Sequence, residues 1–239
     1  MDLRAEQKAV DLCGEWRMAY EHESSGTLRE ATSGREIEAA GVPVWKAHVP
    51  GNFELDLVEN GIIEDPFYGV NIAGLTRFEQ TRVAYWRTFT AEVPSDCEPV
   101  LELKGVDCYA SVYLNGVLLG RCANMLIEHR FPVPQGCLRA QNEILVVIEP
   151  PLRKADEGEY PRLLHAMRAN YESLRTRKAP HMYGWDIMPR ALSAGIWRPL
   201  RIVFLPPERI EDVYLETLAL APDGSRASLH FHYAAKLAS

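Results

Sequence analysis

Turn residues divide this chain into short apolar runs, and this punctuation limits the folds that it can adopt. The sharpest division is Asn115-Gly116, which separates the apolar runs 108–114 and 117–120. An Asn-Gly pair between two such runs is a strong signal for a β-hairpin, because both turn positions need a positive φ. The sequence therefore predicts an antiparallel hairpin here.

Further short runs follow the same rule along the chain. They are rich in β-branched and aromatic residues and are bounded by Pro, Gly, Asn or Asp. The additional strands predicted on this basis are 82–93, 99–104, 127–133, 143–149 and 196–205. Strands at this spacing, without helical periods between them, indicate an all-β sandwich of antiparallel sheets.

Helical signals are few, so one or two short helices are expected. Residues 53–60 carry apolar side chains at helical spacing, with Asn52 as a candidate N-cap and Gly61 as a stop. Residues 161–174 are the second candidate. We expect 152–192 to form a long, mobile or partly ordered excursion from the sandwich, and loops of that length are usually functional. The net charge and poor periodicity of this segment indicate another domain as its natural partner.

A break at Pro206-Pro207 divides the chain. Residues 1–207 are predicted to form the sandwich, whereas residues 208–239 hold two strand-like runs, 212–220 and 226–237. An isolated hairpin is only marginally stable in water, so 208–239 is expected to be the incomplete start of a second β domain.

Composition and charge restrict the classes of function. The chain of 239 residues is 47% hydrophobic and 25% charged, which is typical of a globular protein and excludes disorder. The net charge of −7 argues against nucleic acid and anionic membranes as partners, and no apolar run reaches the roughly 18 residues of a membrane helix. The start of the chain has no apolar signal-peptide core, so we expect a cytoplasmic chain or one whose signal has been removed.

Cysteine and histidine patterns give no metal or cofactor signal. The five cysteines are odd in number and form no CxxC, so we predict reduced thiols rather than disulfides or a zinc site. His165 and His181 have no third ligand nearby. His230 and His232 share one strand face, and a solvent-exposed pair is favoured over a ligand pair. We expect no metal and no cofactor.

Seven short motifs occur in an order that resembles one known family. They are Gly14-Glu15-Trp16, Val49-Pro50-Gly51, Asp65-Pro66-Phe67-Tyr68-Gly69 with Asn71, Tyr85-Trp86-Arg87, Gly105-Val106-Asp107 running into Val112-Tyr113-Leu114-Asn115-Gly116, Gly184-Trp185-Asp186, and Gly195-Ile196-Trp197-Arg198-Pro199. Each motif alone is weak. Together, in this order, they resemble the N-terminal sugar-binding domain of glycoside hydrolase family 2, most closely its β-mannosidase-like branch.

The resemblance implies a jelly-roll sandwich like a galactose-binding domain, followed by the start of an immunoglobulin-like domain. In that family a TIM barrel of roughly 250 residues follows and holds two catalytic glutamates of a retaining mechanism. We therefore expect no catalytic residue in this chain and no activity of the chain alone. The implied partners are a terminal β-mannoside or related β-glycoside and the immunoglobulin-like and barrel domains.

Gly184-Trp185-Asp186 is the sharpest candidate for sugar contact. A loop carboxylate accepts hydrogen bonds from sugar hydroxyls, and a neighbouring indole offers an apolar face to a sugar ring. The resemblance implies that Asp186 reaches into the barrel's active site with Trp185 beside it. Ile187 stands where that branch usually repeats a Trp, which leaves the sugar preference open. The alternative is a structural loop, with Trp185 in a domain interface and Asp186 bonded to local backbone.

Four further residues are candidates for supporting that site. Arg177 and Lys178 are predicted either to pair with acidic groups, those of the barrel or Asp186, or to form a solvated basic surface. Asp65 and Asn71 belong to a tight loop that faces the interior of the assembly in the resembling family. Asp65 is interpreted either as orienting the active-site loops or as part of a turn whose aromatic residues fill the sandwich edge.

Alternation along the strands also predicts the core. Twelve residues are expected mostly between two antiparallel sheets. They are Trp86, Phe89, Leu101, Leu103, Val112, Leu114, Ile144, Val146, Ile148, Ile196, Ile202 and Phe204. Trp86 and Trp197 are both interpreted as sandwich core rather than as platforms for sugar stacking.

Three functions are consistent with the sequence. The leading hypothesis is a non-catalytic sugar-binding and scaffolding domain of a β-mannosidase-like family 2 enzyme. The second is a free-standing carbohydrate-binding module, which exposed aromatic residues and oligosaccharide binding would favour. The third is a structural interaction sandwich, which a buried and locally bonded Asp186 would favour.

Overall fold

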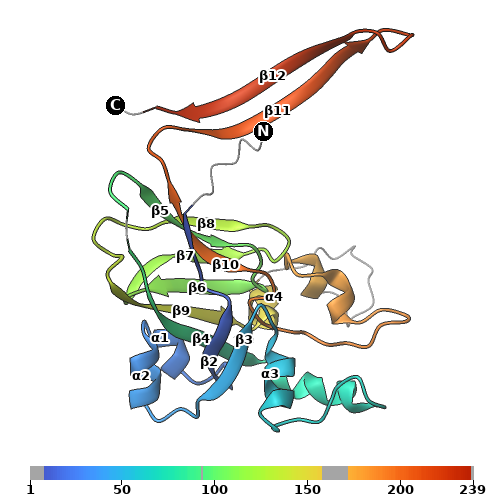
Figure 1. Cartoon of the computed structure of the whole chain (residues 1–239). Helices are drawn as coiled ribbons and strands as arrows, with labels where there is room; N and C mark the ends of the chain where they lie inside the picture. The colour runs from blue at the N-terminus through green and yellow to red at the C-terminus, as the bar shows by residue number, and fades with distance from the viewer. Residues whose placement is uncertain (1–7, 93, 158–171, 238–239) are drawn as a thin grey trace.

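The computed structural model describes residues 8–92, 94–157 and 172–237, and most of them form a sandwich of two antiparallel β-sheets (Figure 1). The four-stranded sheet contains, in order, β1 (Ala9–Asp11), β10 (Leu200–Leu205), β5 (Glu98–Leu103) and β8 (His129–Pro132). The six-stranded sheet contains, in order, β3 (Trp45–Val49), β2 (Gly14–His22), β4 (Thr81–Thr90), β9 (Gln141–Glu149), β6 (Tyr109–Leu114) and β7 (Val117–Ala123). The predicted antiparallel sandwich is confirmed.

The Asn-Gly turn forms as predicted and is locked to the sheet. Asn115 and Gly116 have φ values of 51° and 81° and join β6 to β7. The Asn115 amide donates a hydrogen bond of 2.9 Å to Asn142 Oδ1, and its Oδ1 accepts one of 2.9 Å from the Glu143 backbone. The turn residue therefore also holds the start of β9 in register.

Helices lie outside the two sheets, and the described residues form more of them than the one or two that the sequence predicted. They are α1 (Thr27–Glu30), α2 (Gly34–Ala39), α3 (Phe53–Glu59) and α4 (Pro151–Asp156), with 3-10 turns η1 (Asn71–Phe78), η3 (Glu172–Leu174) and η4 (Pro180–Tyr183). The predicted cap of α3 is confirmed, since Asn52 Oδ1 accepts a hydrogen bond of 3.0 Å from the Leu55 backbone. Of the helix predicted over 161–174, residues 161–171 lie outside the described part of the chain. No described helix is long and apolar enough to cross a membrane.

The space between the sheets holds the main apolar core. Every predicted core residue except Trp86 belongs to this cluster. The alternation of apolar residues therefore located the inner faces of the other strands correctly.

All five cysteines are free thiols, and Cys108, Cys122 and Cys137 are buried.

Trp86 is buried on the opposite face of the six-stranded sheet, so its predicted place was wrong. Tyr85 faces the main core, and Trp86, one residue later on β4, necessarily faces away from it. Its cluster consists of Ala19, Leu28, Ala31, Ile37, Ala84, Trp86, Leu145 and Val147. Leu28 and Ile37 come from α1 and α2, which cover this face (Figure 1).

The prediction that Trp197 belongs to the sandwich core was also wrong, because its side chain is 40% exposed. It precedes β10, which begins only at Leu200, so strand alternation does not apply to it. Its indole lies against Gly105, and the Arg198 guanidinium lies over the ring at 5.1 Å from the centroid.

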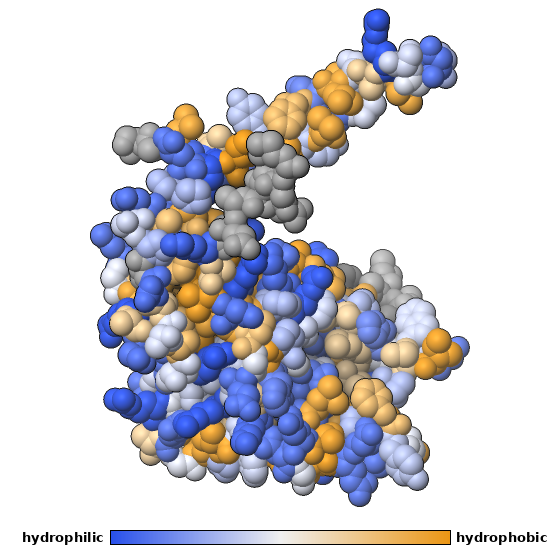
Figure 2. Space-filling view, in the orientation of Figure 1, coloured by the Kyte–Doolittle hydropathy of each residue, from blue (hydrophilic) through white to orange (hydrophobic). Residues whose placement is uncertain are grey.

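A long hairpin projects from the sandwich (Figure 1), and hydrophobic residues are exposed along it (Figure 2). It consists of β11 (Arg209–Leu220) and β12 (Ala227–Lys236), which confirms the two predicted strands. Arg209 and Lys236 both pair with Glu98 on β5, at 2.9 and 2.6 Å, and so tie the base of the hairpin to the sandwich. Its membership in an immunoglobulin-like domain stays a prediction, as does the domain boundary at residue 207.

Gly34 provides a test of the second apolar cluster. A Cβ atom on Gly34 would lie 2.0 Å from Cδ1 of Trp86, so Gly34→Ala must push the indole out of its place. We expect a loss of roughly 1–3 kcal/mol in the free energy of unfolding, measured by urea denaturation. Gly74→Ala is the control, because its Cβ would meet no atom within 4 Å. Equal losses in the two variants would contradict this packing.

Candidate functional site

The candidate motif Gly184-Trp185-Asp186 lies in the segment that connects α4 to β10, which the structure describes from residue 172 onward. Trp185 and Met188 exchange two backbone hydrogen bonds of 2.9 and 3.1 Å. This bridge makes Asp186 and Ile187 the tip of a tight turn. The motif is therefore a defined turn rather than an irregular stretch.

The tip of this turn is open to solvent. Trp185 is 66% exposed, Ile187 is 84% exposed, and Asp186 is exposed between them. A purely structural loop was expected to bury Asp186 and bond it to local groups. In the structure Asp186 is exposed instead. A carboxylate and an indole thus stand together on an accessible turn.

A buried ion pair holds the base of this loop on the sandwich. Lys178 is 1% exposed, and its ammonium group pairs with the Asp107 carboxylate, which precedes β6. Lys178 also donates a hydrogen bond of 2.6 Å to the Ser193 carbonyl. One charged side chain therefore connects both arms of the loop to the sheet.

This pairing corrects both alternatives predicted for Lys178. It neither lies on a solvated surface nor reaches Asp186, because its partner is Asp107 of its own sandwich. Arg177, the next residue back, is exposed, and its carbonyl accepts a hydrogen bond of 2.9 Å from the Met125 backbone. The two adjacent basic residues thus differ completely in environment.

A second buried acid joins this cluster. Glu54 on α3 is buried and accepts a hydrogen bond of 2.5 Å from the Ser193 hydroxyl. Burial raises the pKa of Glu54 to about 7, and burial also raises the pKa of Asp107, against the opposing effect of Lys178. Asp107 Oδ1 has no hydrogen-bond partner within the described structure.

The second candidate loop surrounds Asp65 and Asn71. Asp65 Oδ1 accepts a hydrogen bond of 2.9 Å from the Phe67 backbone, and the Asn71 amide donates one of 3.0 Å to the Asp65 carbonyl. Both candidate residues therefore shape their own turn. The aromatic residues Phe67 and Tyr68 are largely exposed, so they do not fill the sandwich edge as the alternative interpretation required.

An ion pair connects the two loops. Arg190 contacts Glu79, just after η1, through two hydrogen bonds of 2.7 and 2.9 Å. The Arg190 guanidinium also lies 5.7 Å from the centroid of the buried Tyr183 ring. The loops together expose a set of large apolar residues, which we call the apolar loop surface. It consists of Phe67, Tyr68, Val70, Trp185, Ile187 and Met188.

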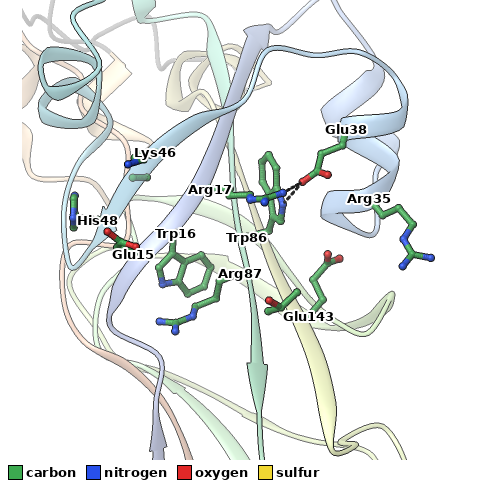
Figure 3. A pocket seen from close by; sticks show the side chains of 12 residues that line it. Glu15, Trp16, Arg17, Arg35, Glu38, Lys46, His48, Trp86, Arg87 and Glu143 are labelled. Atoms are coloured by element: carbon green, nitrogen blue, oxygen red, sulfur yellow. Dashed lines mark hydrogen bonds and ion pairs between the residues drawn. The ribbon is translucent and has the colours of Figure 1, made fainter.

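A separate hollow of about 470 Å³ lies over β2 and β4, beside α2 (Figure 3). Arg17 forms an ion pair with Glu38 at its rim, and the Trp86 indole donates a hydrogen bond of 3.3 Å to the same carboxylate. Glu143, also in the lining, accepts a hydrogen bond of 2.8 Å from the Gly34 backbone. Arg17 and Glu38 therefore pair with each other across this hollow, and Glu143 holds the first residue of α2.

The fold and the motifs agree with a known family. Residues 16–198 match the family described as "Glycosyl hydrolase 2 galactose-binding domain-like". The chain belongs to this family, and its mostly antiparallel β-sandwich is the fold that the resemblance implied.

Similar proteins indicate which branch of this family the chain resembles. The chain is 31% identical over 173 residues to "Beta-mannosidase B" of Thermothelomyces thermophilus, which covers 71% of this chain and 20% of that protein. It is 25% identical over 212 residues to "Mannosylglycoprotein endo-beta-mannosidase" of Lilium longiflorum, covering 84% and 21%. The crystal structure of β-D-mannosidase from Dictyoglomus thermophilum superposes with a TM-score of 0.77 at 27% identity, covering 95% of this chain and 26% of that one.

These matches show that the chain is an N-terminal domain of the kind found in β-mannosidase-like family 2 enzymes. The chain spans about a fifth of the length of the curated relatives named above.

Sequence reasoning missed the buried cluster of Glu54, Asp107, Lys178 and Ser193. Asp107 and Lys178 stand 71 residues apart, and no local pattern links them. Glu54 lies on the predicted helix 53–60, but an acidic residue in a short amphipathic helix is normally exposed. Only the packing of α3 against the loop reveals the contact.

The raised pKa of Glu54 predicts that the free energy of unfolding depends on pH. Because its pKa rises from 4.5 to about 7 on folding, the folded state keeps a proton that the unfolded state loses above about pH 4.5. Its contribution to stability is therefore present at low pH and disappears as the pH rises through 7.

Glu54→Gln removes that dependence. Relative to the unmodified chain, the variant should gain up to about 3 kcal/mol in free energy of unfolding between about pH 5 and about pH 8. Urea denaturation across this range measures it, with exposed Glu64→Gln as control. Asp56, whose pKa burial raises to about 6, titrates in both proteins and cancels from the comparison. If the free energy of unfolding changes with pH in the same way in the unmodified chain and in Glu54→Gln, then Glu54 is not the group that causes the pH dependence.

Lys178→Met tests the ion pair itself. The change leaves Asp107 buried without a counter-charge, which costs about 3–5 kcal/mol in comparable sites. Arg177→Met, at the exposed neighbour, should cost less than about 1 kcal/mol. Adding Asp107→Asn to Lys178→Met should restore part of the stability, because the unpaired charge is then gone. No recovery in the double variant would argue that the aliphatic part of Lys178, not its charge, matters.

Proposed function

We propose that this chain is the non-catalytic sugar-contacting and scaffolding domain of an enzyme that hydrolyses terminal β-mannosides or related β-glycosides. The observation that carries the proposal is the exposed Trp185-Asp186 turn, whose loop is held at its base by the buried Lys178–Asp107 pair. The family match and the β-mannosidase names of its relatives support the substrate class.

Asp186 acts in this proposal as a hydrogen-bond acceptor for sugar hydroxyls. A retaining glycosidase needs two carboxyl groups about 5 Å apart across the scissile bond. Those groups are assigned to the barrel of the complete enzyme, so Asp186 is neither the acid/base nor the nucleophile. Trp185 supplies an apolar face beside the sugar ring.

The apolar loop surface is the proposed contact with the rest of the enzyme. Its six large side chains are exposed here, and exposed apolar patches usually mark interaction sites. The Arg190–Glu79 pair holds the two loops as one unit. Docking of this unit against the barrel would place Asp186 at the sugar subsite and bury the apolar residues around it.

A free-standing carbohydrate-binding module is the second candidate. It is favoured by the exposure of three aromatic side chains on the same two loops, Phe67, Tyr68 and Trp185. Calorimetric titration of the 239-residue chain with mannooligosaccharides separates the two functions. Saturable binding that Trp185→Ala abolishes would favour the module, whereas absence of binding is expected for the domain of a larger enzyme.

Asp186→Asn and Asp186→Ala in the complete enzyme test the leading proposal. We expect kcat/KM for an aryl β-mannoside to fall by roughly one to two orders of magnitude, because the contact strengthens as the sugar approaches the transition state. The thermal stability of the domain should hardly change, since Asp186 is exposed. Asp223→Asn, at the exposed tip of the hairpin, is the matched control. Near-normal kcat/KM in Asp186→Ala would refute the role.

A further inference from the structure

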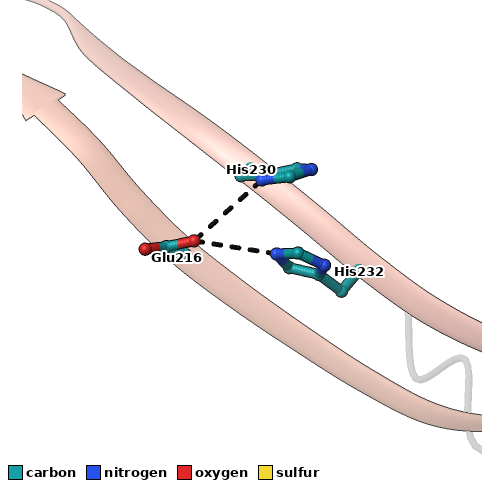
Figure 4. A group of neighbouring side chains, drawn as sticks. All are labelled: Glu216, His230 and His232. Carbon is teal, nitrogen blue, oxygen red and sulfur yellow. Dashed lines mark ion pairs between the residues drawn. The ribbon is translucent and has the colours of Figure 1, made fainter.

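Three metal-ligating side chains meet on one face of the β11–β12 hairpin (Figure 4). Glu216 comes from β11, and His230 and His232 come from β12. In the register of the hairpin, Glu216 stands directly opposite His230, and Tyr214 stands opposite His232. Because residues two apart share a strand face, all three ligands project from the same side of the ribbon.

The potential ligand atoms are already close together. Glu216 Oε2 lies 4.0 Å from His230 Nδ1 and 3.7 Å from His232 Nε2. All three ligand atoms lie within 4.8 Å of one another. Atoms bound to one tetrahedral zinc ion, at bonds of roughly 2.0–2.1 Å, stand about 3.3 Å apart. Rotations of exposed side chains can close the remaining difference without moving the strands.

We propose that Glu216, His230 and His232 form a binding site for a divalent transition-metal ion of the zinc type, with water completing the coordination. Two imidazoles and one carboxylate are a ligand set that suits zinc, whereas magnesium and calcium prefer oxygen ligands alone. The site is distinct from the proposed sugar-contacting loop and does not depend on the function of that loop.

The two imidazoles lie close enough together to share one ion. The ring centroids of His230 and His232 are 3.9 Å apart. A ring nitrogen of each faces the same Glu216 carboxylate oxygen, so the three ligand atoms surround a common point. The Tyr214 ring packs 5.7 Å from the His232 ring and restricts its orientation.

The ribbon has two unlike faces, and this keeps the site accessible. On the other face, Val213 pairs with Tyr233 and Leu215 pairs with Phe231. Any further β-layer would cover that apolar face, because a sheet buries its apolar side. The face with the three ligands, whose side chains are 47–55% exposed, then stays toward solvent.

An ion at this site would link the two strands of the hairpin. Its ligands come from both β11 and β12, so coordination is possible only when the strands are paired in the observed register. A ligand that binds the folded form alone stabilises it by mass action. Metal binding is therefore coupled to the pairing of a ribbon that has no covering layer among the described residues.

The test is a titration of the tag-free 239-residue chain after treatment with a chelator. ZnCl₂ followed by calorimetry should give one ion per chain, and CoCl₂ should give the visible absorption bands of a four-coordinate ion. Glu216→Gln, His230→Asn and His232→Asn should each weaken binding at least about tenfold, since even outer partners of metal ligands have effects of this size. His22→Asn and Glu208→Gln, at exposed positions elsewhere, are the matched controls and should bind as the unmodified chain does.

Three outcomes would overturn the proposal. The first is no saturable binding of either ion. The second is binding that survives all three variants but is lost in His48→Asn, which would assign the ion to the group of His48, Asp56 and Glu59. That group is the weaker competitor, because Asp56 is buried and already accepts hydrogen bonds from the His48 backbone and Tyr85. The third is one ion per two chains with a dimer by size, which would mean that the hairpin alone does not complete a site.

Discussion

The buried pair of Lys178 and Asp107 is the contact on which the candidate site depends. Burying both charges is costly unless they meet, and removing either leaves the other without compensation. Lys178 also bonds the Ser193 carbonyl, and the Ser193 hydroxyl bonds Glu54 on α3. The loop is thereby anchored at two points some fifteen residues apart, and the Trp185-Asp186 turn between them is presented to solvent. An anchored base with an exposed tip supports the proposed contact of Asp186 with a sugar held by another domain.

The sandwich supplies the frame for this anchor. Asp107 lies immediately before β6, in the six-stranded sheet, and Glu54 lies on the helix that follows β3 at the edge of the same sheet. Lys178 and Ser193 thereby fix the loop to both elements, and Ala194 and Ile196, which follow it, pack with the main core. The opposite face of the sheet carries its own apolar cluster under α1 and α2, so the six-stranded sheet is covered on both sides where Trp86 lies.

Two sets of large apolar side chains are exposed in the part of the chain that the structure describes. One is the apolar loop surface, and the other is the Val213, Leu215, Phe231 and Tyr233 face of the hairpin. Soluble proteins seldom leave patches of this kind without a partner. The proposed metal site occupies the polar face of the hairpin and so separates binding of an ion from contact with a further layer.

Local patterns in the sequence determined the strands from β4 to β12, the Asn115-Gly116 turn, the cap of α3 and the alternating residues of the main core, but they did not predict β1, β2 and β3. These features depend on backbone preferences and on the two-residue period of a strand, which neighbouring residues alone specify. The order of the motifs further indicated the family and the Trp185-Asp186 loop. Only the tertiary structure decided that Trp86 packs beneath α2, that Lys178 is buried against Asp107, and that Glu216 joins His230 and His232. The Trp86 and Lys178 contacts join residues far apart in the chain, and the Glu216 contact depends on the exact register of the hairpin. Burial, distance and register decide these contacts, and no local pattern encodes them.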